Sequence, residues 1–138
     1  MSVPAQQFQF VSRDSSLGEA SLAPILELNL AGERPVIASG LVDSGAAVNV
    51  LPYSLGLQLG FDWDRQSQSV TLSGNLASVE SRVVVLSAVV AGFAPVRLAF
   101  AWAKTDTLSV ILGQVNFFLE FDICFFRSRS LFEVRPKP

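Results

Sequence analysis

The N-terminal third of the chain alternates apolar and polar residues with a period of two, as half-buried β-strands do. Residues 8–11 and 26–30 both follow this pattern. A turn at residues 31–35 leads into an apolar segment, residues 36–42, which predicts a strand that returns beside the previous one. Gly40 interrupts this strand and indicates a bulge or a close approach of another part of the chain.

The middle of the chain predicts one short helix and more strands. Pro52 opens the helical candidate "PYSLGLQL", and Gly60 follows it in the position favoured after a helix end. Residues 69–90 read as a long β-hairpin with residues 73–75 near its tip. Residues 96–102 alternate again and predict a strand with one buried face.

The C-terminal part continues the same pattern. Residues 108–113 predict an apolar strand, residues 114–121 a helix, and the apolar segments on either side of residues 127–130 a closing hairpin. We therefore expect residues 1–138 to form a single, mainly β domain with one or two short helices. Residues 1–20 are expected to be an N-terminal extension or an interface strand.

Composition changes this picture in one respect. Half of the 138 residues are hydrophobic and the mean hydropathy is +0.44. The longest uncharged apolar run, residues 83–96, is 14 residues long, whereas a membrane-spanning helix needs about 20. The surplus apolar surface therefore favours burial between subunits or in a cleft. The net charge of −2 and the scattered basic residues argue against nucleic acid and anionic membranes as partners.

The residues available for chemistry are few. The chain has no histidine and one cysteine, Cys124, so catalytic arrangements based on histidine are excluded and a zinc site is not expected. We expect no metal or other cofactor. One cysteine cannot form an internal disulfide, and the N-terminus lacks the pattern of a signal peptide, so we expect a cytoplasmic location. Cys124 lies in an apolar stretch and is expected to be buried.

One carboxylate stands out in the segment "GLVDSGAAVNV", where Asp43 follows an apolar strand and precedes Ser44 and Gly45. An ionised carboxylate in apolar surroundings is costly unless its charge is used. The tripeptide alone is weak evidence, because Asp-Ser-Gly also occurs in ordinary β-turns. A second apolar strand, "VILG", ends in a glycine about 70 residues later and precedes a phenylalanine-rich segment.

These two segments together resemble the retropepsin-like aspartic proteases, the retroviral-type relatives of pepsin. "LVDSGAAVNVLP" matches the active-site loop of the family, and "VILGQVNFFLEFDICF" matches the element that packs behind it. The resemblance covers residues 25–134 and implies an all-β acid-protease fold, a closed β-barrel domain. It also implies an aspartic endopeptidase in which Asp43 is the catalytic residue.

Hydrolysis by carboxylates needs two of them, which share one proton around one water molecule. This chain has one such motif, so the resemblance implies a homodimer in which two copies of Asp43 meet on a two-fold axis. Ser44, Gly45 and Ala46 would support the active-site loop, with the Ser44 hydroxyl bonded across the axis. The substrate would be a peptide or protein.

The resemblance also assigns structural residues outside that loop. Ile111, Leu112 and Gly113 would form the second loop, under the active site. Gly74 would lie at the tip of a flap that closes over the substrate, although a plain hairpin turn explains this glycine equally well.

The chain departs from the retroviral pattern at Ala47 and Gln114, where those proteases commonly carry an Asp–Arg ion pair. Both partners are absent together, so no charge is left unpaired. Two alternative functions stay open at this point. One is a non-catalytic peptide-binding or dimerisation module with the same fold, and the other is an unrelated small β-barrel that binds a lipophilic ligand.

Overall fold

The structure is a computed structural model and describes residues 3–138. Its strands are β1 (Gln6–Gln9), β2 (Val11–Ser12), β3 (Leu22–Ala23), β4 (Ile25–Ala31), β5 (Pro35–Val42), β6 (Asn49–Leu51), β7 (Ser81–Val90), β8 (Val96–Ala103), β9 (Val110–Leu112), β10 (Phe121–Phe126) and β11 (Leu131–Pro136). Its helices are α1 (Tyr53–Gln58) and α2 (Phe117–Glu120), and 3₁₀ turns lie at Ser15–Ser21, Trp63–Arg65, Gly74–Leu76 and Arg127–Arg129.

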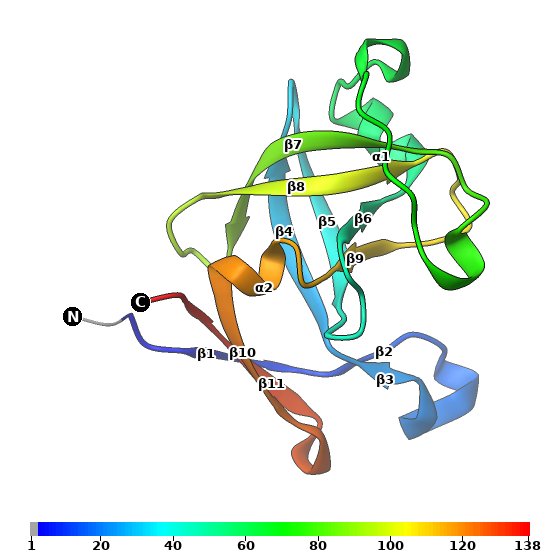
Figure 1. The fold of residues 1–138 in the computed structure, drawn as a ribbon. Helices are drawn as coiled ribbons and strands as arrows, with labels where there is room; N and C mark the ends of the chain where they lie inside the picture. Colours follow the sequence, from blue (N-terminus) through cyan, green and yellow to red (C-terminus); the bar gives the residue numbers. More distant parts are fainter. Residues whose placement is uncertain (1–2) are drawn as a thin grey trace.

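Six strands form a closed barrel in the order β4-β5-β9-β6-β8-β7 (Figure 1). Most neighbours are antiparallel, but β5 pairs with β9 and β6 pairs with β8 in parallel. The expected all-β closed barrel with short helices is therefore confirmed. The parallel pairs bring together chain segments that lie far apart in the sequence.

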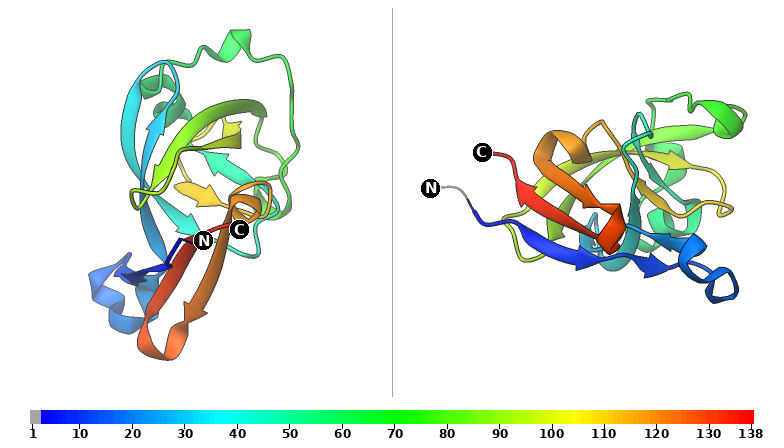
Figure 2. Two further views of the ribbon diagram at one scale, coloured as in Figure 1. Left: turned by 90° about the vertical axis from the view of Figure 1, so that its left-hand side faces the viewer. Right: turned by 90° about the horizontal axis from the view of Figure 1, so that it is seen from below.

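A second, three-stranded sheet in the order β1-β11-β10 lies beside the barrel (Figure 2). The hairpin of β10 and β11 turns at Arg127–Arg129, as the sequence predicts. Phe132 and Val134 of the central strand β11 are fully buried in the main hydrophobic cluster. This terminal sheet is thus packed against the barrel by one of its faces.

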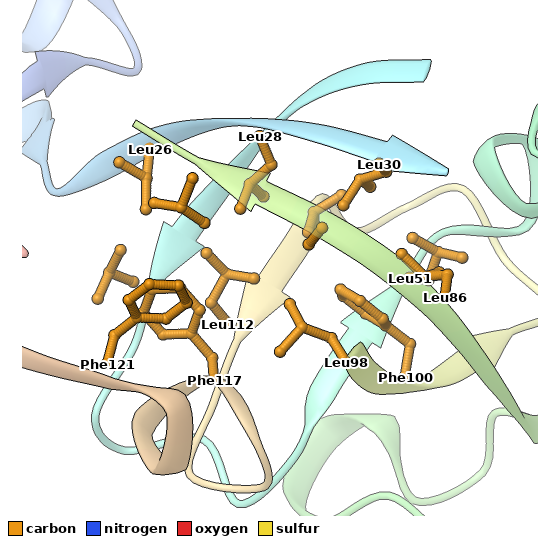
Figure 3. Packing of buried hydrophobic residues seen from close by; sticks show 14 of the residues in the cluster. Leu26, Leu28, Leu30, Leu51, Leu86, Leu98, Phe100, Leu112, Phe117 and Phe121 are labelled. Atoms are coloured by element: carbon orange, nitrogen blue, oxygen red, sulfur yellow. The ribbon is translucent and has the colours of Figure 1, made fainter. Parts of the chain in front are cut away.

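The barrel interior is filled by aliphatic and aromatic side chains from opposite walls (Figure 3). Leu26, Leu28 and Leu30 alternate along β4 and are buried, while the residues between them are exposed or half-buried. Leu98 and Phe100 on β8 are also buried, as their spacing predicts. The period of two in the sequence therefore identified the inner face of these strands correctly.

The glycine in the strand β5 has a packing role. A Cβ atom added to Gly40 would lie 3.0 Å from Val110 Cγ1 and 3.1 Å from Leu112 Cγ. The prediction of a close approach is therefore confirmed, and the neighbour is the parallel strand β9. Gly40 lets β5 and β9 pack closely just before β5 reaches Asp43.

The long hairpin predicted over residues 69–90 is wrong in its first arm. Only β7 is a strand, and the residues before it form a loop with a 3₁₀ turn at Gly74–Leu76. Ser69 makes a single bridge to Arg82. The strand β7 pairs with β8 over residues 81–88 and with β4 over residues 87–90. Near its start it bonds to the preceding segment through the Val70 N–H, which donates to the Ser81 carbonyl oxygen, and through its own Val83 N–H, which donates to the Gln68 carbonyl oxygen.

Two smaller expectations also fail. The helix predicted over residues 114–121 is reduced to Phe117–Glu120, because the preceding residues bond to the Asp43 loop and Phe121 enters β10. Cys124 is exposed rather than buried, since it lies on the face of the terminal sheet that points away from the barrel. Within residues 3–138, no helix is both long enough and apolar enough to cross a membrane.

Candidate active site

Asp43 lies directly after β5, at the point where β5 runs parallel to β9. Val42 is opposite Leu112 in this pair, and the Asp43 N–H donates to the Leu112 carbonyl oxygen at 3.0 Å. Ile111, Leu112 and Gly113 therefore continue beside the start of the Asp43 loop. The structure brings together the two segments that the sequence separates by about 70 residues.

The turn after Asp43 is closed by hydrogen bonds to that residue. The Gly45 N–H donates to Asp43 Oδ1 at 2.9 Å, and the Ala46 N–H donates to the Asp43 carbonyl oxygen at 3.1 Å. Asp43 is half-buried, and within residues 3–138 its second carboxylate oxygen, Oδ2, makes no hydrogen bond. One oxygen of the acid is thus fixed and the other is available.

The residue after β9 must be a glycine. A Cβ atom added to Gly113 would clash with the Val48 carbonyl group and would lie 2.8 Å from the Ala46 carbonyl oxygen. The two loops, residues 43–48 and 113–116, are therefore in direct backbone contact. We call them the paired loops.

Backbone hydrogen bonds hold the paired loops together. The Gln114 N–H donates to the Ala46 carbonyl oxygen, and the Val115 N–H donates to the Ala47 carbonyl oxygen, each at 2.9 Å. The Gln114 side chain also donates from Nε2 to the Ser44 carbonyl oxygen at 2.8 Å. The retroviral pattern has an ion pair at the positions of Ala47 and Gln114. In this chain the neutral side-chain amide of Gln114 holds the loop instead, through its bond to the Ser44 carbonyl oxygen.

A fully buried asparagine, Asn49, and a half-buried one, Asn116, support the same region, and sequence reasoning missed both. Asn49 on β6 is fully buried; its Oδ1 accepts from the Gly113 N–H at 2.8 Å, and its Nδ2 donates to the Ala99 carbonyl oxygen at 3.0 Å. Asn116 Oδ1 accepts from Asn49 Nδ2 at 3.3 Å and from the Ala99 N–H at 2.9 Å.

The sequence did carry a signal for this network. An asparagine inside the apolar run "AVNVL" must find partners when the run is buried. Its partners were not predictable, because they come from β8 and from the loop after β9, which the topology alone brings near β6.

A cavity of about 260 Å³ opens beside Asp43. One wall is the Asp43 loop with β6 and β9, and the other wall belongs to the segment before β7. The lining residues are Asp43, Ala46, Ala47, Val48, Val50, Thr71, Leu72, Ser73, Leu76 and Ile111. Asp43 is the one charged side chain among them, so the cavity presents a single acid to an otherwise mostly apolar space.

The segment in front of the cavity, residues 66–80, contains the flap candidate. Gly74 has φ +63°, is exposed, and would meet no atom within 4 Å if it carried a Cβ atom. It begins a 3₁₀ turn, and the cavity is lined by its neighbour Ser73 rather than by Gly74 itself. Leu72 and Leu76 anchor the segment to a small apolar cluster with Val50. We call residues 66–80 the outer segment.

The described part of the chain was searched for side chains that could bind a metal ion together. Residues 3–138 contain no group of three or more His, Cys, Asp or Glu side chains placed to hold an ion.

No protein-family model and no curated protein sequence matches the chain. Solved structures do match it. A retropepsin-like aspartic protease from Rickettsia conorii aligns with a TM-score of 0.64 and 12% identity, over 96% of this chain and 92% of that chain.

Two further solved structures with a similar fold also align with the chain. The retroviral protease-like domain of Ddi1 from Leishmania major aligns with a TM-score of 0.55 and 14% identity, over 83% of this chain and 95% of that chain. EIAV protease in complex with the inhibitor HBY-793 aligns with a TM-score of 0.53 and 22% identity, over 67% of this chain and 82% of that chain. The protein therefore has the retropepsin-like aspartic protease fold.

Proposed function

We propose that this protein is an aspartic endopeptidase that acts as a homodimer, with one Asp43 from each chain. The observation that carries the proposal is the cavity beside Asp43, which contains one acid on a braced loop in a retropepsin-like fold. Carboxylate-catalysed hydrolysis requires two acids that share a proton. A second chain related by a two-fold axis supplies the missing one.

In the proposed reaction, a water molecule lies between the two Asp43 side chains. The ionised carboxylate takes a proton from the water, and the water oxygen attacks the carbonyl carbon of the scissile bond. The protonated carboxyl of the partner subunit gives its proton to the carbonyl oxygen. The carboxyl that took the proton from the water then gives it to the departing nitrogen, the other carboxylate takes a proton from a hydroxyl of the tetrahedral intermediate, and the C–N bond breaks. The products are a carboxylic acid and an amine, and no covalent enzyme intermediate forms.

The neighbours of Asp43 have supporting roles in this proposal. The Ser44 side chain is exposed and makes no hydrogen bond within residues 3–138, so its hydroxyl is available to bond to the partner loop across the axis. Gly45 and Ala46 hold the turn by bonding to Asp43. Gly113 packs the second loop behind them. This arrangement would keep the two acids in register while the reaction proceeds.

The substrate we propose is an extended peptide with an apolar side chain next to the scissile bond. The cavity is lined mostly by apolar side chains, and about 260 Å³ is room for one large aliphatic or aromatic side chain. The outer segment would act as the flap, with Gly74 near its tip, and would exclude water from the bound peptide. A cytoplasmic, reducing location fits the single cysteine of the chain.

The proposal is tested by cleavage of a peptide library at mildly acidic pH, with and without pepstatin. We expect wild type to cleave and pepstatin to inhibit it, and we expect Asp43→Asn to lose at least about a thousandfold in rate. Asparagine keeps Oδ1 as an acceptor for the Gly45 N–H, so the variant should fold normally. Equal cleavage by both proteins would refute the enzyme, and peptide binding without cleavage by either would support the non-catalytic module.

A further inference from the structure

Ser81 begins β7, directly after the outer segment, and its side chain is buried without a partner. The residue is 2% exposed, and within residues 3–138 its hydroxyl is the one buried side-chain oxygen or nitrogen that makes no hydrogen bond. A hydroxyl that loses water on burial and gains no partner destabilises the state that buries it. Native proteins keep few such groups, so this one calls for a physical explanation.

The strand pairing shows which way the Ser81 side chain points. Ser81 is opposite Ala103 in the antiparallel pair of β7 and β8, and the side chains of opposite residues lie on the same face of a sheet. Ala103 is fully buried in a small apolar cluster with Leu72 of the outer segment. Leu76 and Val79 pack against the same cluster. The Ser81 hydroxyl therefore lies on the face of β7 that the outer segment covers.

The next residue, Arg82, points to the opposite face and holds the base of the outer segment. Its Nη1 donates to the Trp63 carbonyl oxygen at 2.7 Å, and its guanidinium carbon lies 4.7 Å from the centre of the Trp63 ring. Lys104 Nζ lies 5.1 Å from the centre of the same ring. The Lys104 N–H also donates to the carbonyl oxygen of Glu80, the last residue of the segment, at 2.9 Å. We call Trp63, Arg82 and Lys104 the clasp.

The clasp is fixed to the core of the barrel through Trp63. The Trp63 ring packs edge-on against Trp102, with ring centroids 5.0 Å apart, and against Tyr53, with centroids 5.7 Å apart. Trp102 is fully buried and donates from Nε1 to the Tyr53 carbonyl oxygen at 3.0 Å. Cations over a tryptophan ring are attracted to its face. Both ends of the outer segment are therefore held at one place on a rigid aromatic group.

The part of the outer segment between these ends forms a wall of the cavity beside Asp43. Its residues that line the cavity are Thr71, Leu72, Ser73 and Leu76. The backbone hydrogen bonds of residues 73–79 stay within the segment's own turns, and Figure 1 shows the segment as the green loop between α1 and β7. Lifting this part away from β7 would open the cavity and give water access to the Ser81 hydroxyl.

We propose that Ser81 is a positioning residue that sets how readily the outer segment opens. The Ser81 hydroxyl is unpaired while the segment is closed and becomes hydrated when the segment opens, so it lowers the free energy needed for opening. The clasp keeps the two ends in place, so the segment closes again over the same cavity. The inference rests on the proposed function in that the outer segment is the flap of the proposed protease.

A thiol on the outer segment measures this opening without substrate. Leu72 is 5% exposed, so iodoacetamide reaches a cysteine at this position when the segment opens. The reporter protein carries Leu72→Cys together with Cys124→Ser, which removes the exposed natural thiol. We expect Ser81→Ala, which deletes the unpaired hydroxyl and keeps Cβ, to slow labelling of the reporter at least about fivefold.

Ser87 provides the matched control for this substitution. It lies on the same strand and is half-buried, but it is opposite Arg97 and Ala31 in the barrel rather than under the outer segment. Ser87→Ala should leave the labelling rate within about twofold of the reporter's rate. Circular dichroism checks that both variants are folded. Equal labelling rates for Ser81→Ala and Ser87→Ala would overturn the role of Ser81.

The clasp is tested by a variant with an effect of opposite sign. Arg82→Met keeps an unbranched apolar stem but removes the charge over the Trp63 ring and the hydrogen bond to the Trp63 carbonyl oxygen. We expect this variant to label at least about fivefold faster than the reporter protein. Adjacent residues on opposite faces of β7 would thus change the same rate in opposite directions. An unchanged rate for Arg82→Met would overturn the role of the clasp.

Binding kinetics separate this inference from the proposed function. Pepstatin must pass the outer segment on entry and on release, whereas Ser81 is covered both before and after binding. We therefore expect Ser81→Ala to slow association and dissociation alike, each at least about fivefold, and to change Kd by less than about twofold. Pepstatin binding with rates that Ser81→Ala does not change would overturn the role of Ser81 and leave the protease standing. Slower labelling in a protein that neither binds pepstatin nor cleaves peptides would overturn the protease and keep the role of Ser81.

Discussion

The paired loops behind Asp43 and the outer segment in front of it are held in different ways. The paired loops share backbone hydrogen bonds, a side-chain bond from Gln114 and the buried amide of Asn49. The outer segment bonds to the barrel near its two ends, through the bridge at Ser69 and through the Lys104 N–H, which donates to the Glu80 carbonyl oxygen. Between these ends, the backbone bonds of residues 73–79 stay within the segment's own turns. Its main anchors to the barrel are apolar side chains such as Leu72. The part that carries the acid is fixed, and the part that covers the cavity is loosely attached.

The difference fits the work proposed for each region. Two acids must be held in register to share a proton, and a covering segment must open to admit a peptide. Regions with few buried contacts and few shared hydrogen bonds open locally at low cost in free energy. We therefore expect a rigid site under a mobile cover.

Hydrogen exchange of the wild-type protein should show the largest contrast. The Gly113 N–H is bonded to a buried side chain, whereas the Leu76 N–H bonds within the turn to the Ser73 carbonyl oxygen at 3.3 Å. We expect the Gly113 amide to be protected at least about a thousandfold more than the Leu76 amide, as measured by NMR. Comparable protection of the two amides would contradict the contrast between the regions.

Replacing the buried asparagine should cause the largest loss of stability. Asn49→Leu leaves the Gly113 N–H and the Ala99 carbonyl group buried without a partner. An unsatisfied buried group costs about 2 kcal/mol, so we expect a loss of about 4 kcal/mol in the free energy of unfolding by urea denaturation. Asn75→Leu, in the exposed outer segment, is the matched control and should change stability by less than about 0.5 kcal/mol.

The same substitution at two glycines compares the regions directly. Gly113→Ala places a methyl group against the Val48 and Ala46 carbonyl groups and should cost about 3 kcal/mol. Gly74→Ala meets no neighbour and pays for its positive φ, about 1 kcal/mol. Thermal and urea denaturation of both variants would measure the difference, and equal losses would show that the paired loops are not tightly packed.

Removing the Gln114 side chain should change stability less than the substitutions at Asn49 and Gly113. Gln114→Ala removes the hydrogen bond to the Ser44 carbonyl oxygen at the protein surface and should cost about 1 kcal/mol. Gln68→Ala, which removes an exposed amide in the outer segment, should be neutral. If Gln114 positions the loop, its variant should lower kcat more than it raises KM. A change in KM alone would indicate that this side chain acts on substrate binding.

The sequence allowed the fold and the turn after Asp43 to be predicted because both depend on local patterns. Alternation identified the inner faces of β4 and β8, and the loop around Asp43 carries its own turn residues. The outer segment was misread as a hairpin arm because its alternation looked like that of a strand. Strand β7 pairs instead with β8 and, over residues 87–90, with β4, and no local pattern reveals these partners.

The network of Asn49 and the exposure of Cys124 were missed for a related reason. Asn49 finds its partners on β8 and beyond β9, at sequence separations of 50 and more. Cys124 lies in an apolar run that predicts burial, yet it lies on the outer face of a sheet that packs against the barrel by its other face. Both features depend on which strands become neighbours, which the chain does not encode in any short segment.

We propose that one chain holds half of the site and that a second chain completes it. Titration of the protein with pepstatin in a calorimeter, together with sedimentation of the complex, measures this stoichiometry. We expect about 0.5 inhibitor bound per chain, on a particle with twice the 14.9 kDa mass of the chain. One inhibitor bound to each chain, on a particle of 14.9 kDa, would contradict it.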